Sequence, residues 1–200
     1  MFALPSLRRD LPVLRGNRVH LRMPLVGDFR EWAALRHDSR GFLEPWEPRW
    51  TLDELERSAW RIRLRRYRED HAAGSAVPFF IFANEGDRLV GGITLGNIRQ
   101  GVAQSGQIGY WMGERHAGKG YMVDAIRLLV PYAFDTLRLH RIEAACIPDN
   151  VRSMRVLEKA GFQREGLLRS YLRINGAWKD HFLYALIADE RPGDRRGSSS

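Results

Sequence analysis

Apolar and polar side chains alternate along several short segments of the chain, the pattern of strands that bury one face. Val19, Leu21 and Met23 alternate with polar neighbours, so residues 18–23 are expected to form a half-buried strand. Two more apolar runs flank Glu85-Gly86-Asp87, which is typical of a hairpin turn. The pattern predicts about seven strands: 18–23, 77–84, 88–98, 106–113, 141–147, one from Phe162 onward, and 178–187.

Apolar residues that recur every three or four positions predict about four helices. The strongest begins at Met122 and contains Pro131, which should remove one backbone hydrogen bond and bend the helix. Another runs from Asn150, a good N-cap, to Ala160 before Gly161. The remaining two are residues 27–38 and a long helix from Leu52 to about Asp70, with Leu52, Leu55, Ala59 and Ile62 on one apolar stripe.

The order of these elements is β-α-α-β-β-β-α-β-α-β-β, and only residues 106–147 resemble a parallel β-α-β unit. A doubly wound parallel sheet would alternate strands and helices throughout. We therefore predict an α+β fold with a mixed, mostly antiparallel sheet and one crossover helix. Residues 17–190 are expected to form a single domain between an N-terminal tail (1–16) and a C-terminal tail (191–200).

Composition narrows the class of protein. The chain has 200 residues, 44% of them hydrophobic, which is enough for one well-buried core. Its apolar runs are far shorter than the ~20 residues that cross a bilayer, so no membrane span is expected. The single cysteine, Cys146, lies in a predicted strand and reads as a buried, inert thiol. These features favour a reducing compartment, the cytoplasm. The expected assembly is a monomer or dimer.

The net charge of +8 favours anionic partners such as nucleic acid or a polyphosphate cofactor. Part of this charge is concentrated in the six arginines between Arg57 and Arg68. One interpretation of this segment is a solvated helix face. The other is a weak docking patch for an RNA-rich particle.

Residues 113–120 read Gly-Glu-Arg-His-Ala-Gly-Lys-Gly and join a predicted strand to the strongest helix. Helix N-termini attract anions, and small residues let a phosphate approach the backbone. A P-loop, G-x-x-x-x-G-K-[ST], would need a hydroxyl where Gly120 stands, and that hydroxyl would hold Mg²⁺. A purely structural turn is a further alternative, although the glycines and the charge favour an anion site.

From Arg115 the same loop reads R-x-x-G-x-G, which resembles the pyrophosphate loop of the GNAT acetyltransferases. The later N-x-x-S…E-K-x-G-F-x-x-E-G pattern, starting at Asn150, resembles the RimJ/RimL-type branch, which acetylates protein N-termini. The segments FLEPWEP and GAWKDHFLYAL are similar to those of the ribosomal-protein-alanine N-acetyltransferases of that branch. The resemblance covers residues 17–188 and implies a GNAT fold with a splayed parallel pair of strands.

The resemblance also implies acetyl-CoA as cosubstrate, no metal, and a set of cofactor-binding residues. Pantetheine would lie where strand 107–113 parts from strand 141–147. Asn150 would reach the pantetheine arm, although it serves equally well as a helix N-cap. Backbone groups of Trp111, Met112 and Gly113 would bind pantetheine, and the pyrophosphate would lie on Arg115, His116, Ala117, Gly118, Lys119 and Gly120.

For catalysis, the resemblance points to Ser153. Many relatives use a tyrosine at the position of Leu157, so a hydroxyl at Ser153 would instead stabilise the departing thiolate; a solvated serine is the alternative. Glu47 is our candidate for the group that receives the amine, with a surface salt bridge as its alternative role. Further candidates that the sequence leaves open are Glu44, Asp180, His116 and His181 as proton acceptors, and Tyr110 and Tyr171 as lining residues.

The resulting hypothesis is an enzyme that transfers acetyl from acetyl-CoA directly to the N-terminal α-amine of a protein, such as a ribosomal protein that begins with Ala or Ser. A small amine, for example a polyamine or an aminoglycoside, is an alternative acceptor. The third interpretation is a non-catalytic module that binds CoA or RNA.

Overall fold

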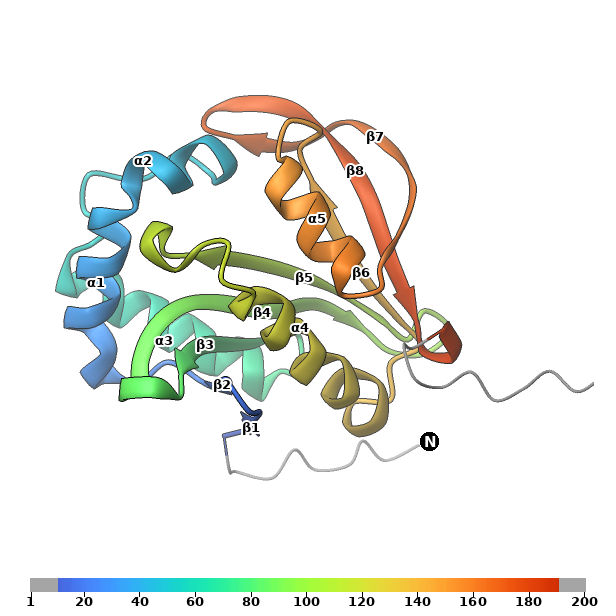
Figure 1. Cartoon of the computed structure of the whole chain (residues 1–200), viewed down its shortest axis with the longest axis horizontal. Helices are drawn as coiled ribbons and strands as arrows, with labels where there is room; N and C mark the ends of the chain where they lie inside the picture. Colours follow the sequence, from blue (N-terminus) through green and yellow to red (C-terminus); the bar gives the residue numbers. More distant parts are fainter. Residues whose placement is uncertain (1–10, 191–200) are drawn as a thin grey trace, which may run out of the picture.

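One open mixed sheet of eight strands organises the computed structural model, which describes residues 11–190 (Figure 1). The strand order is β1-β2-β3-β4-β5-β6-β8-β7, with β5 and β6 parallel and all other neighbours antiparallel. This topology confirms the predicted α+β class. The strands are β1 (Val13–Arg15), β2 (Val19–Arg22), β3 (Val77–Ala83), β4 (Arg88–Arg99), β5 (Ser105–Met112), β6 (Arg141–Cys146), β7 (Gln163–Ile174) and β8 (Ala177–Ile187).

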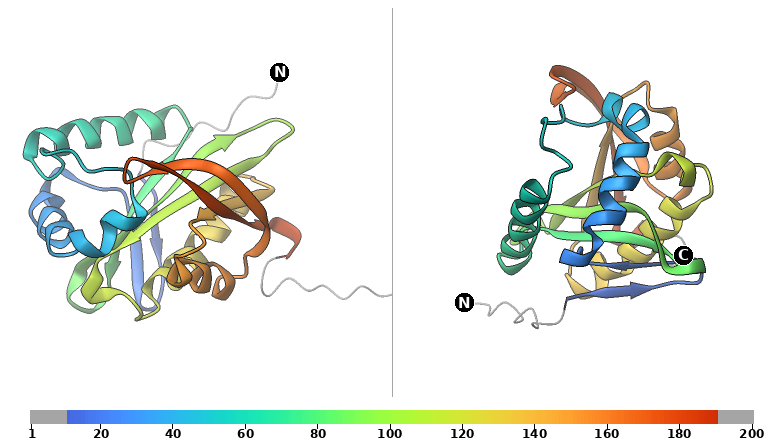
Figure 2. Two further views of the ribbon diagram at one scale, coloured as in Figure 1. Left: turned by 90° about the horizontal axis from the view of Figure 1, so that it is seen from above. Right: turned by 90° about the vertical axis from the view of Figure 1, so that its left-hand side faces the viewer.

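Helices cover both faces of this sheet, as Figure 2 shows. Every residue of β3 is buried, as expected for a strand with packing on both sides. Phe79 and Ile81 face α4 and α5, whereas Phe80 and Phe82 face α1 and α3. The helices are α1 (Phe29–Asp38), α2 (Arg40–Leu43), α3 (Arg57–Ala72), α4 (Tyr121–Pro131) and α5 (Val151–Lys159), with short 3₁₀ turns at Val26–Asp28, Glu44–Trp46, Glu85–Asp87, Glu114–His116 and Ala188–Glu190.

Two elements exceed the predicted counts. Strand β1 lies inside the segment predicted as an N-terminal tail and pairs antiparallel with β2. Helix α2 is a single turn within the loop predicted around residues 42–50. Both are too short to carry a periodic pattern, and their neighbours hold them in place. Residues 1–10 and the predicted C-terminal tail lie outside the described residues.

Helix α3 begins at Arg57, so the predicted start at Leu52 was wrong. Residues 51–56 form turns, and both Leu52 and Ile62 of the predicted apolar stripe are exposed. The buried face is instead formed by Trp60 and Leu64. The Trp60 ring stacks on Trp32 of α1 with 4.7 Å between centroids. Burying this large aromatic surface outweighs burying the smaller aliphatic stripe.

The arginines of α3 separate into different environments. Arg57 lies over the Phe29 ring, and Arg63 forms an ion pair with Glu54. Arg61, Arg65 and Arg68 are exposed. The contact of this helix with an RNA-rich particle stays a prediction.

The bend predicted at Pro131 takes the form of a change in helix type. Pro131 is the last residue of α4, and Tyr132–Thr136 continue as a π-helical turn. The Leu137 N–H donates to the Tyr132 carbonyl at 3.0 Å. A proline has no N–H to donate, and the change of helix type follows directly after it. None of the helices within residues 11–190 is long and apolar enough to cross a membrane.

A close approach between α1 and the end of β5 fixes the loop that follows. A Cβ added to Gly113 would lie 2.4 Å from Leu35 Cδ1, and Leu35 is fully buried. The next residue, Glu114, donates its N–H to the Ser39 hydroxyl at 2.9 Å. Only a residue without a side chain allows this packing.

We expect Gly113→Ala to lower the free energy of unfolding by about 1–3 kcal/mol, because the new methyl group overlaps a buried side chain. Urea and thermal unfolding measure this change. Gly109→Ala on the same strand is the matched control, because a Cβ there meets nothing within 4 Å. Equal stability of the two variants would show that the Leu35 contact imposes no constraint.

Candidate active site

The parallel strands β5 and β6 part in the middle of the sheet. Their pairing runs from Ser105 opposite Arg141 to Ile108 opposite Ala144 and then stops. Beyond that point β5 stays paired with β4 as far as Met112, and β6 stays paired with β8 as far as Cys146. The splayed pair implied by the sequence is therefore present.

The hydrogen bonding of β5 determines which backbone groups face the gap. The Gly113 N–H donates to the Val90 carbonyl at 2.9 Å, so the Trp111 N–H also points toward β4. The backbone groups of Tyr110 and Met112, which alternate with these, point into the gap. Of the three residues predicted to bind pantetheine through their backbone, only Met112 is oriented to do so.

A cavity of about 780 Å³ occupies the gap and the space between the N-terminal ends of α4 and α5. Gly113, Arg115 and Lys119 do not line it. The predicted cofactor-binding residues that do are Trp111, Met112, His116, Ala117, Gly118, Gly120, Asn150 and Ser153.

The glycines of the loop have left-handed backbone conformations. Gly118 has φ = 77°, and Gly120, the N-cap of α4, has φ = 84°. A Cβ at Gly118 would meet nothing within 4 Å, so the loop opens onto free space. The first amides of α4 have no partners within the helix and carry the positive end of its dipole. This end suits an anion, and its N-cap has no hydroxyl to hold the metal of a P-loop.

Basic side chains surround this cavity. The pKa of His116 is lowered by burial and by Arg115, Lys119 and Arg88. Arg152, Arg155 and Lys159 of α5 also line the cavity. These three were not among the predicted cofactor-binding residues, although their i, i+3, i+7 spacing places them on one helix face.

Ser153 lies at the start of α5, next to the gap. Its N–H donates to Asn150 Oδ1 at 3.1 Å, which establishes Asn150 as a helix N-cap. Its hydroxyl lies 2.8 Å from the hydroxyl of Tyr110. Burial raises the pKa of Tyr110, so that this phenol stays protonated. Two neutral hydroxyl groups thus form a pair beside the cavity.

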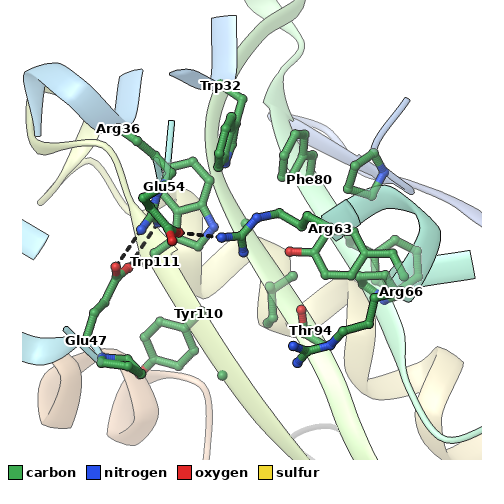
Figure 3. A pocket seen from close by; sticks show the side chains of 18 of the residues that line it. Trp32, Arg36, Glu47, Glu54, Arg63, Arg66, Phe80, Thr94, Tyr110 and Trp111 are labelled. Carbon is green, nitrogen blue, oxygen red and sulfur yellow. Dashed lines mark hydrogen bonds and ion pairs between the residues drawn. The ribbon is translucent and has the colours of Figure 1, made fainter. Parts of the chain in front are cut away.

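A second cavity, of about 430 Å³, lies on the other face of the sheet against α1 and α3 (Figure 3). Where β5 leaves β6 it shares part of its lining with the first cavity, and we call this shared region the junction. The residues that line both are Glu47, Gly109, Tyr110 and Trp111.

Glu47 is the acidic residue at this junction, and an arginine holds it in place. Arg36 donates to both of its carboxylate oxygens, at 3.1 and 2.6 Å, and the Trp50 indole N–H donates at 2.8 Å. The Arg36 guanidinium lies 4.3 Å from the centre of the Trp50 ring and 5.1 Å from that of Trp111. Arg36 is almost fully buried. No sequence signal distinguished it from the other arginines.

Of the other proton acceptors suggested by the sequence, Glu44 and Asp180 lie away from the junction of the two cavities. Glu44 pairs with Arg40 at 2.7 Å, and Asp180 accepts the N–H of Ser170 at 2.8 Å; neither lines either of the two cavities described above. His181 lines the first cavity, with its Nδ1 2.9 Å from the Lys179 carbonyl oxygen. Among residues 11–190, no three His, Cys, Asp or Glu side chains are grouped so that they could hold a metal.

Residues 18–163 match the family model described as an acetyltransferase (GNAT) domain. The chain is a GNAT acetyltransferase. It is an acetyl-CoA-dependent N-acetyltransferase, and acetyl-CoA is its cosubstrate. The matching family model, together with the relatives named next, confirms the GNAT assignment and the RimJ/RimL branch.

Several relatives match this GNAT protein over nearly their whole length. "Probable N-acetyltransferase YjcK" of Bacillus subtilis is 40% identical over 88% of this chain and 97% of its own. The [ribosomal protein uS5]-alanine N-acetyltransferase of Escherichia coli is 34% identical over 93% and 97%. The structure of Mycobacterium smegmatis RimJ with CoA-disulfide superposes with a TM-score of 0.83 at 35% identity, covering 91% of this chain and 88% of that one.

Cys146 at the end of β6 lines the first cavity but is nearly fully buried, and burial raises its pKa to about 11. At pH 8 we expect iodoacetamide to alkylate it about 100-fold more slowly than free cysteine, because the reactive thiolate is scarce. The rate should rise with pH up to about 11, as followed by mass spectrometry. Unfolded protein, the control, should react like free cysteine. Fast labelling of the native protein would contradict the buried, protonated thiol.

Proposed function

We propose that this enzyme acetylates the N-terminal α-amine of a protein, with ribosomal proteins as the acceptor class. The observation that carries the proposal is the junction of the two cavities at Glu47 and Tyr110. One cavity has the features of a CoA site, and the other admits an acceptor from the opposite face of the sheet. The thioester and the amine would meet where β5 leaves β6.

The charge of the first cavity suits acetyl-CoA. The pyrophosphate would lie on the loop residues that line this cavity, His116, Ala117, Gly118 and Gly120, and on the first turn of α4. Arg152, Arg155 and Lys159 supply positive charge for the remaining phosphate. Pantetheine would run along the gap, where the backbone of Met112 and the Asn150 side chain are its partners. The Met112 N–H is then the donor that polarises the thioester carbonyl.

Glu47 would receive the amine. The ammonium must lose a proton before nitrogen can attack the thioester carbon, and the Glu47 carboxylate is the acceptor for that proton, through a water. The new C–N bond forms as the carbonyl becomes an oxyanion. Arg36 and Trp50 fix the carboxylate, so that it presents the same face to each incoming amine.

Ser153 and Tyr110 would stabilise the leaving group. When the oxyanion collapses, the C–S bond breaks and the thiolate of CoA departs. In a pair of hydroxyls one donates and the other accepts, so a Tyr110 hydroxyl that donates to Ser153 leaves the serine hydrogen free for the sulfur. The thiolate then takes its proton from this chain of hydroxyls or from solvent.

The charge of the second cavity favours a peptide acceptor over a polyamine. Its lining carries two glutamates, Glu47 and Glu54, but also four arginines: Arg36, Arg49, Arg63 and Arg66. A polycation such as spermidine or an aminoglycoside is repelled by this excess of positive charge. A peptide brings one ammonium and an otherwise uncharged backbone. The named activity of the Escherichia coli relative, on ribosomal protein uS5, supports the same acceptor class.

A panel of acceptors tests the function. Purified enzyme with acetyl-CoA should acetylate peptides that begin with Ala or Ser at least about tenfold faster, in kcat/KM, than spermidine or an aminoglycoside. Release of free CoA measures the rate, and mass spectrometry locates the acetyl group. A peptide with a blocked N-terminus and a free lysine is the control. Acetylation of polyamines alone would establish the small-amine alternative.

Glu47→Gln and Ser153→Ala should each lower kcat/KM by about 10- to 1,000-fold, as expected for groups that handle protons. Glu44→Gln is the matched control, because Glu44 lies in the same turn, pairs with Arg40 and lines neither cavity. CoA affinity should stay unchanged in Glu47→Gln. Near-normal rates in either variant would remove that residue from the mechanism.

A further inference from the structure

The far side of the acceptor cavity carries arginines that the acetyl transfer itself does not use. Figure 3 shows Arg66 of α3 across the pocket from Glu47, with Arg63 beside it. Both line the second cavity and neither lines the first. An amine at Glu47 would therefore place the following residues of its chain near α3.

The two arginines differ in how well they are neutralised. Arg63 is about one-third exposed and pairs with Glu54. The Arg66 side chain is 80% exposed, and its acidic partner, Asp70, is 3.7 Å away on the same helix. An exposed pair at this separation is weak, so most of the positive field of Arg66 remains available to a ligand.

We propose that Arg66 selects acceptors that carry an acidic side chain at the second, third or fourth residue. This inference rests on the proposed function, and it names the class of N-terminus that the site prefers. An extended peptide advances about 3.3 Å per residue, so residues two to four follow the cavity away from Glu47. A carboxylate there meets Arg66 and adds to the charge complementarity of the complex.

The charges that line the cavity distinguish an acidic from a basic side chain on the peptide. Its lining holds four arginines and two glutamates, and both glutamates are already paired with arginines, Glu47 with Arg36 and Glu54 with Arg63. A basic side chain near the acceptor amine therefore finds no unpaired carboxylate in this lining. An acidic one finds Arg66 and Arg49, both exposed.

The test uses peptides that begin with Ala and carry a single Glu at position two, three or four, compared with Gln and Lys at the same position. At one position or more, Glu should exceed Gln by about two- to fivefold in kcat/KM, and Lys should fall below Gln. The difference should lie in KM and should shrink in 1 M salt, because exposed charges are screened.

Arg66→Glu should reverse this order, so that Lys peptides are preferred to Glu peptides, and Arg66→Lys should retain the original order. Arg65→Glu is the matched control. Arg65 immediately precedes Arg66 on the same helix and is similarly exposed. Its Nε lies 4.0 Å from Glu69 Oε1, but the residue does not line the cavity. Affinity for CoA, measured in each variant, reports on the integrity of the fold.

The possible outcomes separate the role of Arg66 from the proposed acetylation of peptides. No preference for Glu at any position, or a preference that persists in Arg66→Glu, overturns the role of Arg66 while peptide acetylation stands. A reversal in Arg65→Glu as well would assign the effect to the overall charge of α3 and overturn the cavity assignment. Failure to acetylate any peptide overturns the proposed function together with the selection.

Discussion

The site depends on the parting of β5 and β6 after Ile108 and Ala144. Each strand keeps its outer neighbour, β4 for one and β8 for the other, so the sheet stays intact while its centre opens. The strand edges in the gap carry backbone donors and acceptors that need partners. An extended ligand with amide groups can supply them. The two cavities share lining residues at this opening, which is why the proposed reaction is placed there.

The last turns of α1 and its C-cap position both the loop before α4 and Glu47. Leu35 packs against Gly113, where the loop before α4 begins, and Ser39 accepts the N–H of Glu114 in that loop. Arg36, between them on the same helix, holds Glu47. The same part of α1 therefore positions both the loop before α4 and Glu47. The tip of the β7–β8 hairpin also holds the backbone of Glu47, because Asn175 donates its N–H to the Glu47 carbonyl at 2.9 Å.

Local signals made the order of helices and strands along the chain, and the loop before α4, predictable. Glycine spacing and an amphipathic helix located Gly118 and Gly120, and Asn150 marked a helix start that the structure confirms. The register of α3 was not predictable, because Trp60 is buried by stacking on a distant helix. The role of Arg36 escaped prediction for the same reason: its partners Glu47 and Trp111 are near only in the fold. The directions of Trp111 and Gly113 likewise follow from pairing with β4.

The arginines of the acceptor cavity also bear on reactivity. A carboxylate has about four lone-pair sites, and Arg36 and Trp50 use three of those of Glu47, which leaves one for a water or an incoming amine. Glu47 is thereby fixed without being fully occupied. Because the lining carries more arginines than glutamates, it disfavours a second positive charge and so favours the neutral amine, the form that attacks the thioester. On the proposed function, the charge that disfavours polycations would also promote the loss of the proton from the incoming ammonium.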